Sequence, residues 1–358
     1  MANNVCIGIG NTGNNIIQLI ASNTHLEDTL LYAVDSVASS VNMDNIDRVK
    51  YIPIISDNKS GSGRSRERGS EMMQMHLSTP EFTTLIRDCG ESKSPVIVIS
   101  STAGGTGSGA IVPLCKKIID ENPDITLIPI LVVPAMDDPI AYHMNTADLM
   151  AEMGEIGIKT YCVFRNKSKT SNYTEINQEV VTAIEILHGK WYGATDVDSV
   201  DDTDMIRVCS VPGRLIIVKT EATNTQYLKR LITEKVLNGN QPWSDPSNNF
   251  SMLAISLKSG FANGDIDDVF DDIKSRCLGC LDTFKNPIQT DDSTMVATCI
   301  ISGLPNVKLR EIDLNDYQVA SGISDGVKKS TRPDFMKKNT SVKKSTLGSI
   351  RGHKISNE

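Results

Sequence analysis

The sequence predicts an α/β fold with a parallel sheet in the N-terminal half and a smaller α+β domain after it. In the N-terminal half, continuously apolar runs of strand length, such as Val96–Ile99, alternate with helical patterns. Strands that are apolar throughout are typical of parallel sheets covered by helices on both faces. Beyond about residue 190 the spacing of the runs changes, which favours a second domain. The chain has 358 residues, 39% of them apolar, which is enough for two cores.

The N-terminal half is expected to hold alternating strands and helices. The expected strands are the apolar runs at residues 5–9, 30–34, 51–55, 95–100, 125–133 and 160–164. Helices are expected around residues 16–20 and over 111–120, each directly after a glycine-rich loop. Residues 60–69 are rich in glycine and arginine and are expected to form a flexible loop, with a partly helical segment at 71–87.

The second half begins with an amphipathic helix expected over Tyr173–Gly189, where Ile176, Val180 and Ile184 fall on one stripe. Strands at 215–218, 252–257 and 295–301 and a helix at 265–277 are expected to form the smaller domain. Large apolar residues become sparse beyond about Leu314. The chain is therefore expected to end in a tail without a core of its own.

Composition argues against a membrane protein and against a disulfide scaffold. No apolar run approaches the roughly 20 residues of a membrane helix, and Leu127–Val133 is closed by Pro134. The start of the chain, Met1–Asn4, has no basic region, so a signal peptide is not expected. Eight cysteines are too few for a disulfide framework, which predicts reduced thiols and a cytoplasmic location.

A metal site made of protein ligands alone is not expected. Cys277 and Cys280 form a single C-x-x-C pair, whereas a zinc site needs two further ligands, and no second pair or nearby pair of histidines exists. The five histidines are scattered, without H-x-x-x-H spacing. These cysteines are expected to be ordinary core or surface residues.

Charge divides the chain unevenly. Residues 328–358 hold nine basic and two acidic side chains, a net charge of +7. The whole chain carries −8, so residues 1–327 carry −15. An acidic body with a basic end is not typical of a general nucleic-acid enzyme, and it points to a separate electrostatic contact at the C-terminal end.

The first glycine-rich motif is Gly8-Ile9-Gly10-Asn11-Thr12-Gly13, between a predicted strand and a predicted helix. Such glycines let backbone amides approach a phosphate at a helix N-terminus. Asp35 ends the next strand, 22 residues after Gly13, where a nicotinamide-cofactor domain would place its ribose-binding acid. A nicotinamide-dependent oxidoreductase and a purely structural tight turn therefore stay open at this point.

A second motif, Ala103-Gly104-Gly105-Thr106-Gly107-Ser108-Gly109, also joins a buried strand to a helix. Two such loops in one domain can hold one polyphosphate from two sides, which a dinucleotide fold does not require. No lysine follows the glycines, so the motif is not a P-loop. Thr106 and Ser108 supply hydroxyl groups, while the glycine amides stay uncovered.

Gly104–Gly109 resembles the glycine-rich signature of the tubulin/FtsZ superfamily, and the resemblance covers most of residues 5–310. It implies a GTP-binding domain (1–172), a central helix (173–190), a C-terminal GTPase-activating α+β domain (191–313) and a helical or disordered basic tail (314–358). It also implies binding of GTP or GDP with Mg²⁺.

The same resemblance implies contacts by position. Gly8–Asn14 corresponds to the first nucleotide loop, Gly61–Gly69 to the loop that senses the γ-phosphate, although it is richer in arginine than usual, and Val133–Pro139 to the ribose loop. Asn166 and Asn177 correspond to the guanine contacts. The implied nucleotide-binding residues are Gly10, Asn11, Thr12, Asn14, Asp35, Gly104, Gly105, Thr106, Gly107, Ser108, Asp137, Asn166 and Asn177.

Residues 196–204 carry an acidic run, Asp-Val-Asp-Ser-Val-Asp-Asp-Thr-Asp. Carboxylates this close repel one another, so the run is either an exposed surface loop or lies near a cation. In the superfamily this loop completes the GTPase site of the next subunit in a head-to-tail protofilament. The resemblance implies that Asp201 and Asp204 are the catalytic acids, while Ser199 stands where FtsZ-like proteins carry asparagine. It implies assembly-stimulated hydrolysis of GTP to GDP and phosphate.

The basic end of the chain resembles the TubZ group, the tubulin-like GTPases of plasmid and phage partition systems. Lysine pairs stand at 328/329, 337/338 and 343/344. The resemblance implies that this tail engages a TubR-like DNA-binding adaptor, and through it centromere DNA, so that a filament carries DNA without a membrane partner. A solubilising extension is the plainer interpretation of the tail. An FtsZ-like division protein and the oxidoreductase are the alternative functions.

Overall fold

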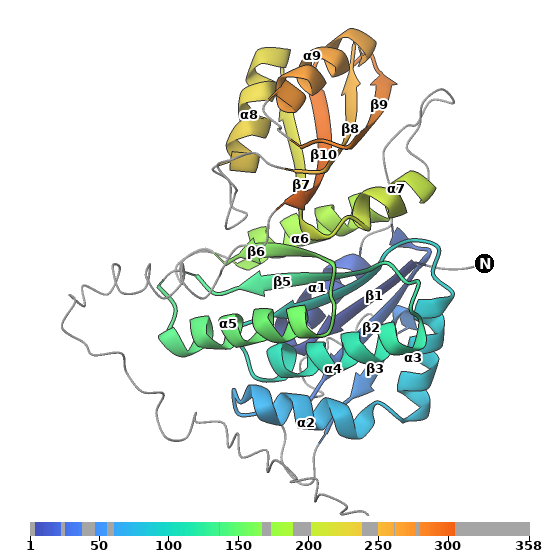
Figure 1. The fold of residues 1–358 in the computed structure, drawn as a ribbon, viewed down its shortest axis with the longest axis vertical. Coiled ribbons are helices and arrows are strands. Elements are labelled where there is room, and N and C mark those ends of the chain that lie inside the picture. The colour runs from blue at the N-terminus through green and yellow to red at the C-terminus, as the bar shows by residue number, and fades with distance from the viewer. Residues whose placement is uncertain are drawn as a thin grey trace, which may run out of the picture.

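The computed structural model describes residues 4–22, 26–37, 47–55, 61–135, 137–166, 173–188, 202–237, 250–260, 262–275 and 279–304. Within them the strands form one sheet in the order β3-β2-β1-β4-β5-β6-β7-β10-β8-β9 (Figure 1). The strands from β3 to β6 in this order are all parallel to one another. The expected α/β fold with a parallel sheet is therefore confirmed.

The strands of the N-terminal half agree with the apolar runs of the sequence, except that the third strand lies two residues earlier than expected. In chain order they are β1 (Asn4–Ile9), β2 (Thr29–Asp35), β3 (Val49–Pro53), β4 (Val96–Ser101), β5 (Leu127–Val133) and β6 (Thr160–Arg165). The helices are α1 (Gly10–Ala21), α2 (Arg66–His76), α3 (Pro80–Gly90), α4 (Thr106–Glu121), α5 (Ile140–Glu155) and α6 (Tyr173–Leu187).

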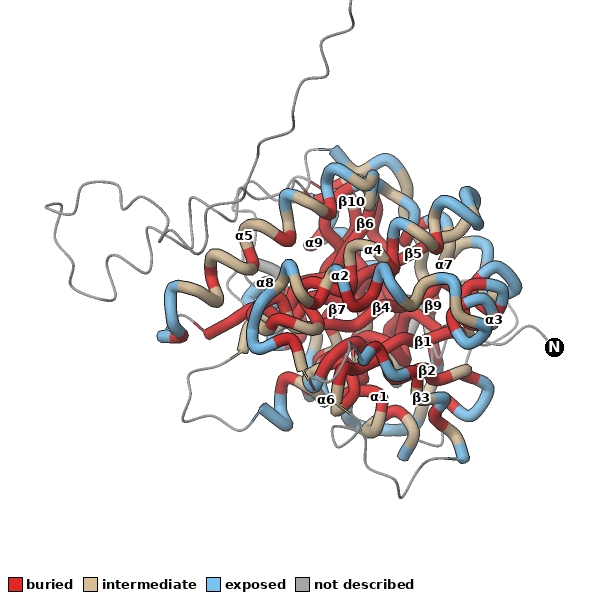
Figure 2. The backbone as a smooth tube through the Cα atoms, turned by 90° about the horizontal axis from the view of Figure 1, so that it is seen from below, coloured by how far each residue is buried: buried red, intermediate tan, exposed pale blue. Residues whose placement is uncertain are grey.

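Helices cover both faces of this parallel sheet, which is why its strands are apolar throughout. Successive side chains of a strand point to opposite faces. Cys6 accordingly joins the core under α1 and α6, whereas Val5 and Ile7 join the core under α2, α3, α4 and α5. Figure 2 shows the buried strands enclosed by helices whose outer surfaces are exposed.

The helix α6 connects the two halves of the molecule. Its predicted apolar stripe is present, since Ile176, Val180 and Ile184 are buried. Its last two turns are buried on further sides as well, including the Glu185 side chain, because the helix packs against α1, β6 and β7. A single amphipathic stripe therefore underestimates how deeply this helix is buried.

The C-terminal half forms a smaller α+β unit. Its elements are α7 (Asp202–Cys209), β7 (Gly213–Ala222), α8 (Thr225–Leu237), β8 (Met252–Ser259), α9 (Ala262–Ser275), β9 (Asp282–Gln289) and β10 (Met295–Leu304). β10 lies antiparallel between β7 and β8, and α8 and α9 pack on one face. β7 joins the parallel sheet through two residue pairs with β6, Thr160–Gly213 and Tyr161–Arg214.

The sequence patterns missed several elements. α2 begins at Arg66, inside the segment expected to be a flexible loop, because the Ser65 hydroxyl accepts a hydrogen bond from the Arg68 amide and caps the helix. α5, α7, α8 and β9 were not expected either. β9 carries Lys285, Asn286 and Pro287 and has few fully buried residues, so it lacks the apolar run that reveals the other strands.

Candidate functional site

A cavity of about 460 Å³ lies at the carboxyl ends of three neighbouring strands, β2, β1 and β4. The lining residues follow these strands or precede α2: Ile9, Gly10, Asn11, Thr12, Asp35, Ser36, Val37, Gly61, Ser62, Arg64, Ser101, Gly104, Gly105, Thr106 and Gly107. In the order β3-β2-β1-β4-β5-β6, chain connections run in opposite directions from β1, and open α/β sheets bind ligands at such a point. Eight residues predicted to contact a nucleotide line this one cavity.

The two glycine-rich loops are in direct contact with each other. A methyl group added to Gly10 would lie 3.0 Å from the Gly107 amide nitrogen, and one added to Gly107 would lie 3.1 Å from the Ile9 carbonyl oxygen. Gly10 also has a φ of 70°, which glycine adopts far more readily than other residues. Glycine is required here because the two main chains approach more closely than side chains allow.

The helices that follow these loops begin without side-chain caps. α1 starts after Ile9 and α4 after Gly105, and neither of these residues has a side-chain acceptor; the first turns of both helices also lack acidic residues. By contrast, α2 is capped by Ser65 and carries Glu67 in its first turn. Helix N-termini with uncovered N–H groups attract anions. Two of them at one cavity favour a ligand with several negative charges.

Asp35 is fixed at the edge of this cavity. Its carboxylate accepts hydrogen bonds from Asn14 Nδ2 at 3.2 Å and from the Ser36 amide at 2.6 Å. Asp35 and Asn14 are both buried. Asn14 thus lies behind the cavity wall rather than in its lining, and its position indicates that it orients Asp35.

Three hydroxyl groups meet beside Asp35. Thr106 Oγ1 lies within hydrogen-bond distance of Ser36 Oγ, at 2.9 Å, and donates a hydrogen bond to Ser62 Oγ at 3.0 Å. Ser36, Ser62 and Arg64 were not among the predicted contacts. The signals were present, since Ser36 directly follows Asp35 and the other two belong to the segment predicted to sense the γ-phosphate.

The second glycine loop is held in place by α5. Asn145 Nδ2 donates to the Ala103 carbonyl oxygen at 2.9 Å, and the hydroxyls of Thr102 and Thr146 are 2.7 Å apart. Ser108 is buried, and its hydroxyl donates to the Gly104 carbonyl oxygen rather than facing the cavity. The structure therefore places Ser108 as a support of the loop.

The residues expected to hold the ribose and base lie outside the lining of this cavity. Asn166 follows β6, and its amide donates to the Val133 carbonyl oxygen at 3.0 Å. Asn177 lies in α6 and is half-buried, while Asp137 is exposed before α5. The neighbouring Asp138 is buried and accepts a hydrogen bond from the Ala135 amide at 2.9 Å, so it shapes this turn. The roles of Asn166, Asn177 and Asp137 stay predictions.

Asp204 lies at the amino ends of the strands, opposite the cavity at their carboxyl ends. Just after α7, Ser210 Oγ is 3.1 Å from Thr126 Oγ1, and the Val211 carbonyl oxygen accepts a hydrogen bond from Thr160 Oγ1 at 2.8 Å. Thr126 precedes β5 and Thr160 begins β6, so α7 is placed at the amino ends of the strands (Figure 1). Asp201 and the earlier acidic residues lie outside the described residues. The chain's own cavity, at the carboxyl ends, is a strand length away from Asp204.

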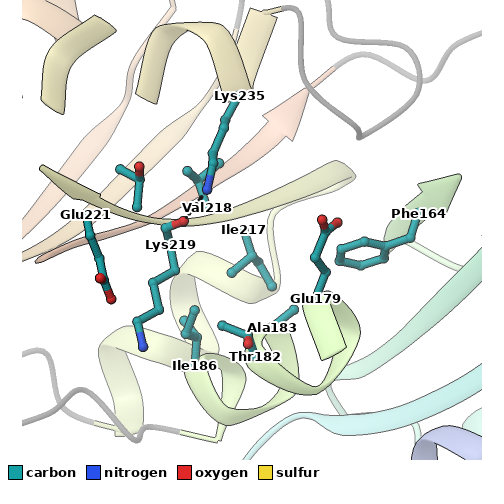
Figure 3. Close-up of a pocket in the computed structure, with 11 residues that line it drawn as sticks. Phe164, Glu179, Thr182, Ala183, Ile186, Ile217, Val218, Lys219, Glu221 and Lys235 are labelled. Atoms are coloured by element: carbon teal, nitrogen blue, oxygen red, sulfur yellow. Dashed lines mark hydrogen bonds between the residues drawn. The ribbon is translucent and has the colours of Figure 1, made fainter. Parts of the chain in front are cut away.

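A second cavity, of about 400 Å³, lies between α6 and β7 (Figure 3). Ala183, Ile186 and Ile217 give it an apolar wall, and Lys235 of α8 donates to the Lys219 carbonyl oxygen at 2.5 Å beside it. None of the described residues predicted to bind a nucleotide lines it. It lies between the two halves of the chain and shares no lining residue with the cavity at the carboxyl ends of β2, β1 and β4.

The sequence also raised two other kinds of site, a metal site and reactive cysteines. No group of three or more His, Cys, Asp or Glu side chains there forms a metal site. The seven cysteines found there are free, and burial raises the pKa of the Cys209 and Cys299 thiols to about 12, which makes them poor nucleophiles. Cys277 lies outside this part of the chain. In the same ranges, no helix combines the length and apolar character needed to cross a bilayer.

Comparison with known proteins agrees with this geometry. Residues 3–173 match the family model described as Tubulin/FtsZ family, GTPase domain. A curated relative, the tubulin-like protein CetZ of Thermococcus kodakarensis, is 23% identical over 246 residues. The match covers 63% of this chain and 61% of the relative.

Solved structures resemble nearly the whole chain. A GTPγS-form protofilament of TubZ from Bacillus thuringiensis serovar israelensis gives a TM-score of 0.68 at 16% identity, covering 90% of this chain and 92% of that one. An FtsZ dimer from M. jannaschii gives 0.66 at 15% identity, covering 85% and 88%. The chain therefore has the tubulin/FtsZ fold, and its residues 3–173 match the GTPase domain of that family.

Proposed function

We propose that this chain binds GTP in the cavity at the carboxyl ends of β2, β1 and β4 and hydrolyses it when a second copy of the chain completes the site. The observation that carries the proposal is the meeting of two uncapped helix N-termini at one cavity lined by glycine amides and hydroxyl groups. Such a cavity suits a polyphosphate, whose transfer chemistry needs positioning and charge stabilisation above all. The matching family model and the GTPγS-form TubZ neighbour support GTP as the nucleotide.

The residues around Asp35 fit Mg²⁺. The cation prefers oxygen ligands and in nucleotide sites takes one or two carboxylates together with phosphate oxygens. Asp35 and the hydroxyls of Ser36 and Thr106 provide such oxygens. When bound, Mg²⁺ would offset the repulsion between Asp35 and the phosphates. Asn14 keeps the carboxylate of Asp35 aimed at this position.

The acids of residues 201–204 are proposed to act on the nucleotide of a neighbouring subunit. Asp204 lies at the amino edge of the sheet and the cavity at the carboxyl edge, so they are separated by a strand of roughly 20 Å. A head-to-tail contact between copies brings these opposite edges together. The carboxylates would then orient the attacking water, and hydrolysis would follow assembly. The protofilament and dimer forms of the neighbours support this arrangement.

Subunit complementation tests the shared site. Asp204→Ala should bind GTP and assemble but barely release phosphate. Gly104→Leu should not bind GTP. Gly104 lines the cavity, and a methyl group there would meet no protein atom within 4 Å. A leucine side chain would therefore fit without disturbing the loop and would occupy space that the phosphates need. We expect an equimolar mixture to regain phosphate release, since each variant supplies what the other lacks. The exposed acid Asp271 gives a matched control as Asp271→Ala. Mixed filaments that pellet together without regaining activity would contradict a shared site.

Nucleotide preference separates this proposal from an oxidoreductase. Isothermal titration should show tight binding of GTP and GDP and little binding of NAD or NADP. Tight NAD binding with no GTP binding would overturn the proposal. The strand order β3-β2-β1-β4-β5-β6 also occurs in dinucleotide-binding domains, so the fold of the N-terminal half alone does not decide the matter.

We further propose the finer assignments that the sequence implies. The units are a GTP-binding domain (1–172), a central helix (173–190), a C-terminal GTPase-activating domain (191–313) and a basic tail (314–358). The tail, which lies outside the described residues, would engage a TubR-like DNA-binding adaptor, so that cytoplasmic filaments segregate plasmid or phage DNA. Its net charge of +7 over residues 328–358 supports contact with an acidic surface or with DNA.

Removal of residues 328–358 tests the role of the tail. The truncated chain should keep GTP binding and lose co-sedimentation with a TubR-like adaptor bound to DNA. Direct contact with phosphates predicts loss of capture at raised salt, and contact with the adaptor alone predicts weaker salt dependence. An FtsZ-like division role is the alternative, supported by the FtsZ dimer among the structural neighbours. If the truncated chain captured the adaptor–DNA complex as well as the full chain does, the proposed role of the tail would be wrong and the division role would be favoured.

A further inference from the structure

Two successive peptide groups of the second glycine loop are held by side chains that do not line the cavity. The Ala103 carbonyl oxygen accepts a hydrogen bond from Asn145 Nδ2 of α5 at 2.9 Å, and the Gly104 carbonyl oxygen accepts one from the Ser108 hydroxyl of α4. A carbonyl oxygen can only accept, so the NH₂ end of the Asn145 amide must face it. Both carbonyl groups are therefore turned toward the helices that support the loop.

The orientation of each carbonyl group fixes the amide that follows it. No cis peptide bond occurs in the described part of the chain, and in a trans peptide the C=O and N–H groups point in opposite directions. The bond to Asn145 thus turns the Gly104 N–H away from α5, and the bond to Ser108 turns the Gly105 N–H away from the first turn of α4. Both glycines line the cavity, and neither amide donates a hydrogen bond within the described residues. Successive free N–H groups of this kind bind anions.

A second contact keeps Asn145 beside the loop. The hydroxyl of Thr146, the next residue on α5, donates to the Tyr142 carbonyl oxygen at 3.0 Å, which uses its single proton. The Thr102 hydroxyl then donates to Thr146 Oγ1 at 2.7 Å. Thr102 and Thr146 are fully buried, so this pair of hydrogen bonds ties α5 to the start of the loop from inside the core. Asn145 is thereby held at a fixed distance from Ala103.

We propose that Asn145 is a positioning residue for phosphate binding: by holding the Ala103 carbonyl group, it keeps the Gly104 N–H aimed at the phosphates of a bound nucleotide. The assignment rests on the proposed function of the cavity. Gly104 needs such a restraint because glycine is conformationally permissive, and a methyl group there would meet no atom within 4 Å, so packing does not fix this peptide group. Without the bond to Asn145, the peptide group can rotate and present its carbonyl oxygen to the phosphates. An attraction would then be replaced by a repulsion.

Equilibrium binding of fluorescent GTPγS to the full chain, with Mg²⁺ present, tests the assignment against a matched control. Asn122 is also half-buried, and its Nδ2 donates to the Ile86 carbonyl oxygen at 3.3 Å, but it lies at the C-terminal end of α4. Asn145→Ala and Asn122→Ala each lose one hydrogen bond from a side chain to the main chain, so their urea midpoints should fall by similar amounts. Only Asn145→Ala should weaken GTPγS binding, by about tenfold or more.

A second pair of variants separates the hydrogen bond from the space that the side chain fills. Asn145→Gln keeps an amide donor, whereas Asn145→Leu has a similar size and no donor, so Asn145→Gln should bind GTPγS more tightly.

Three results would overturn the assignment alone. They are wild-type GTPγS binding by Asn145→Ala, equal binding by the glutamine and leucine variants, and a urea midpoint of Asn145→Ala far below that of Asn122→Ala, which would indicate a general structural role. A wild-type chain that binds neither GTPγS nor GDP would overturn the proposed function together with it.

Discussion

The crossing of α2 over α4 at Gly109 gives the sharpest test of the packing behind the candidate site. A methyl group at Gly109 would lie 2.0 Å from the Arg66 carbonyl oxygen and 2.8 Å from the Ser70 amide nitrogen. Ordinary contacts of a methyl carbon begin near 3.4 Å, so α2 would have to move by more than 1 Å. These are main-chain atoms, which cannot be relieved by a change of rotamer. We expect Gly109→Ala to destabilise the chain by about 1–3 kcal/mol.

Gly154→Ala is the matched control. Gly154 also lies in a helix, α5, but a methyl group there would meet no atom within 4 Å. Alanine favours helix over glycine by about 1 kcal/mol, so this variant should be slightly more stable than wild type. The two substitutions are chemically identical, and their free energies of unfolding should differ by roughly 2–4 kcal/mol.

Urea unfolding of the nucleotide-free chain, followed by circular dichroism, measures this difference. The slope against urea should stay unchanged in both variants, so that the midpoints report stability. Gly109→Ala should also weaken GTP binding, because displacement of α2 moves residues 61–64 away from Gly105. A Gly109→Ala chain as stable as Gly154→Ala would refute the close contact between the two helices.

Three further outcomes are expected. Burial raises the pKa of Asp88, but hydrogen bonds from Tyr32, Arg87 and Lys50 outweigh it and hold the pKa below its usual range. The ionised carboxylate therefore stabilises the fold above the unfolded pKa of about 4, and this contribution is lost as the pH falls through the lower folded pKa. Urea unfolding between pH 7 and 3 should show that the free energy of unfolding falls less steeply with pH in Asp88→Asn than in wild type. Asn14→Ala removes the side-chain hydrogen bond to Asp35 Oδ2 and leaves the one from the Ser36 amide. It should weaken Mg²⁺-dependent GTP binding by about tenfold or more, measured by titration at fixed and at zero Mg²⁺. Among the described cysteines Cys280 is half-buried and the rest are buried, so a thiol reagent should modify Cys280 first and the others only on unfolding, as peptide mapping over time would show.

The sequence predicted the parallel sheet because its strands are buried on both faces. Val96–Ile99 and the run before Pro134 are apolar without interruption, and both are strands between two helix layers. It predicted β9 and α5 poorly for the opposite reason. β9 lies at the edge of the sheet with several half-exposed residues, and α5 has a weak apolar stripe with polar residues facing the second glycine loop.

The candidate site was predictable where glycine is physically required. Gly10, Gly105 and Gly107 allow main chains to approach each other, and that requirement is visible as a motif. The residues that surround them come from separate strands and helices, so their convergence depends on tertiary structure. Asn145, which holds the second glycine loop from α5, has no local pattern that announces its role. Arg64 belongs to Gly61–Gly69, the segment predicted to sense the γ-phosphate. The sequence around it does not reveal that its backbone adopts a left-handed conformation.

The two halves of the sheet meet along a short seam. Six parallel pairings among the described strands run four residues or more, whereas β6 and β7 share only Thr160–Gly213 and Tyr161–Arg214. Few backbone hydrogen bonds therefore join the two halves of the sheet, and the core shared by β6, α6 and β7 also holds them together. The cavity between α6 and β7 borders the seam, so twisting one half against the other changes its width first (Figure 3). We expect force applied along the molecule to separate β6 from β7 before it distorts the glycine loops.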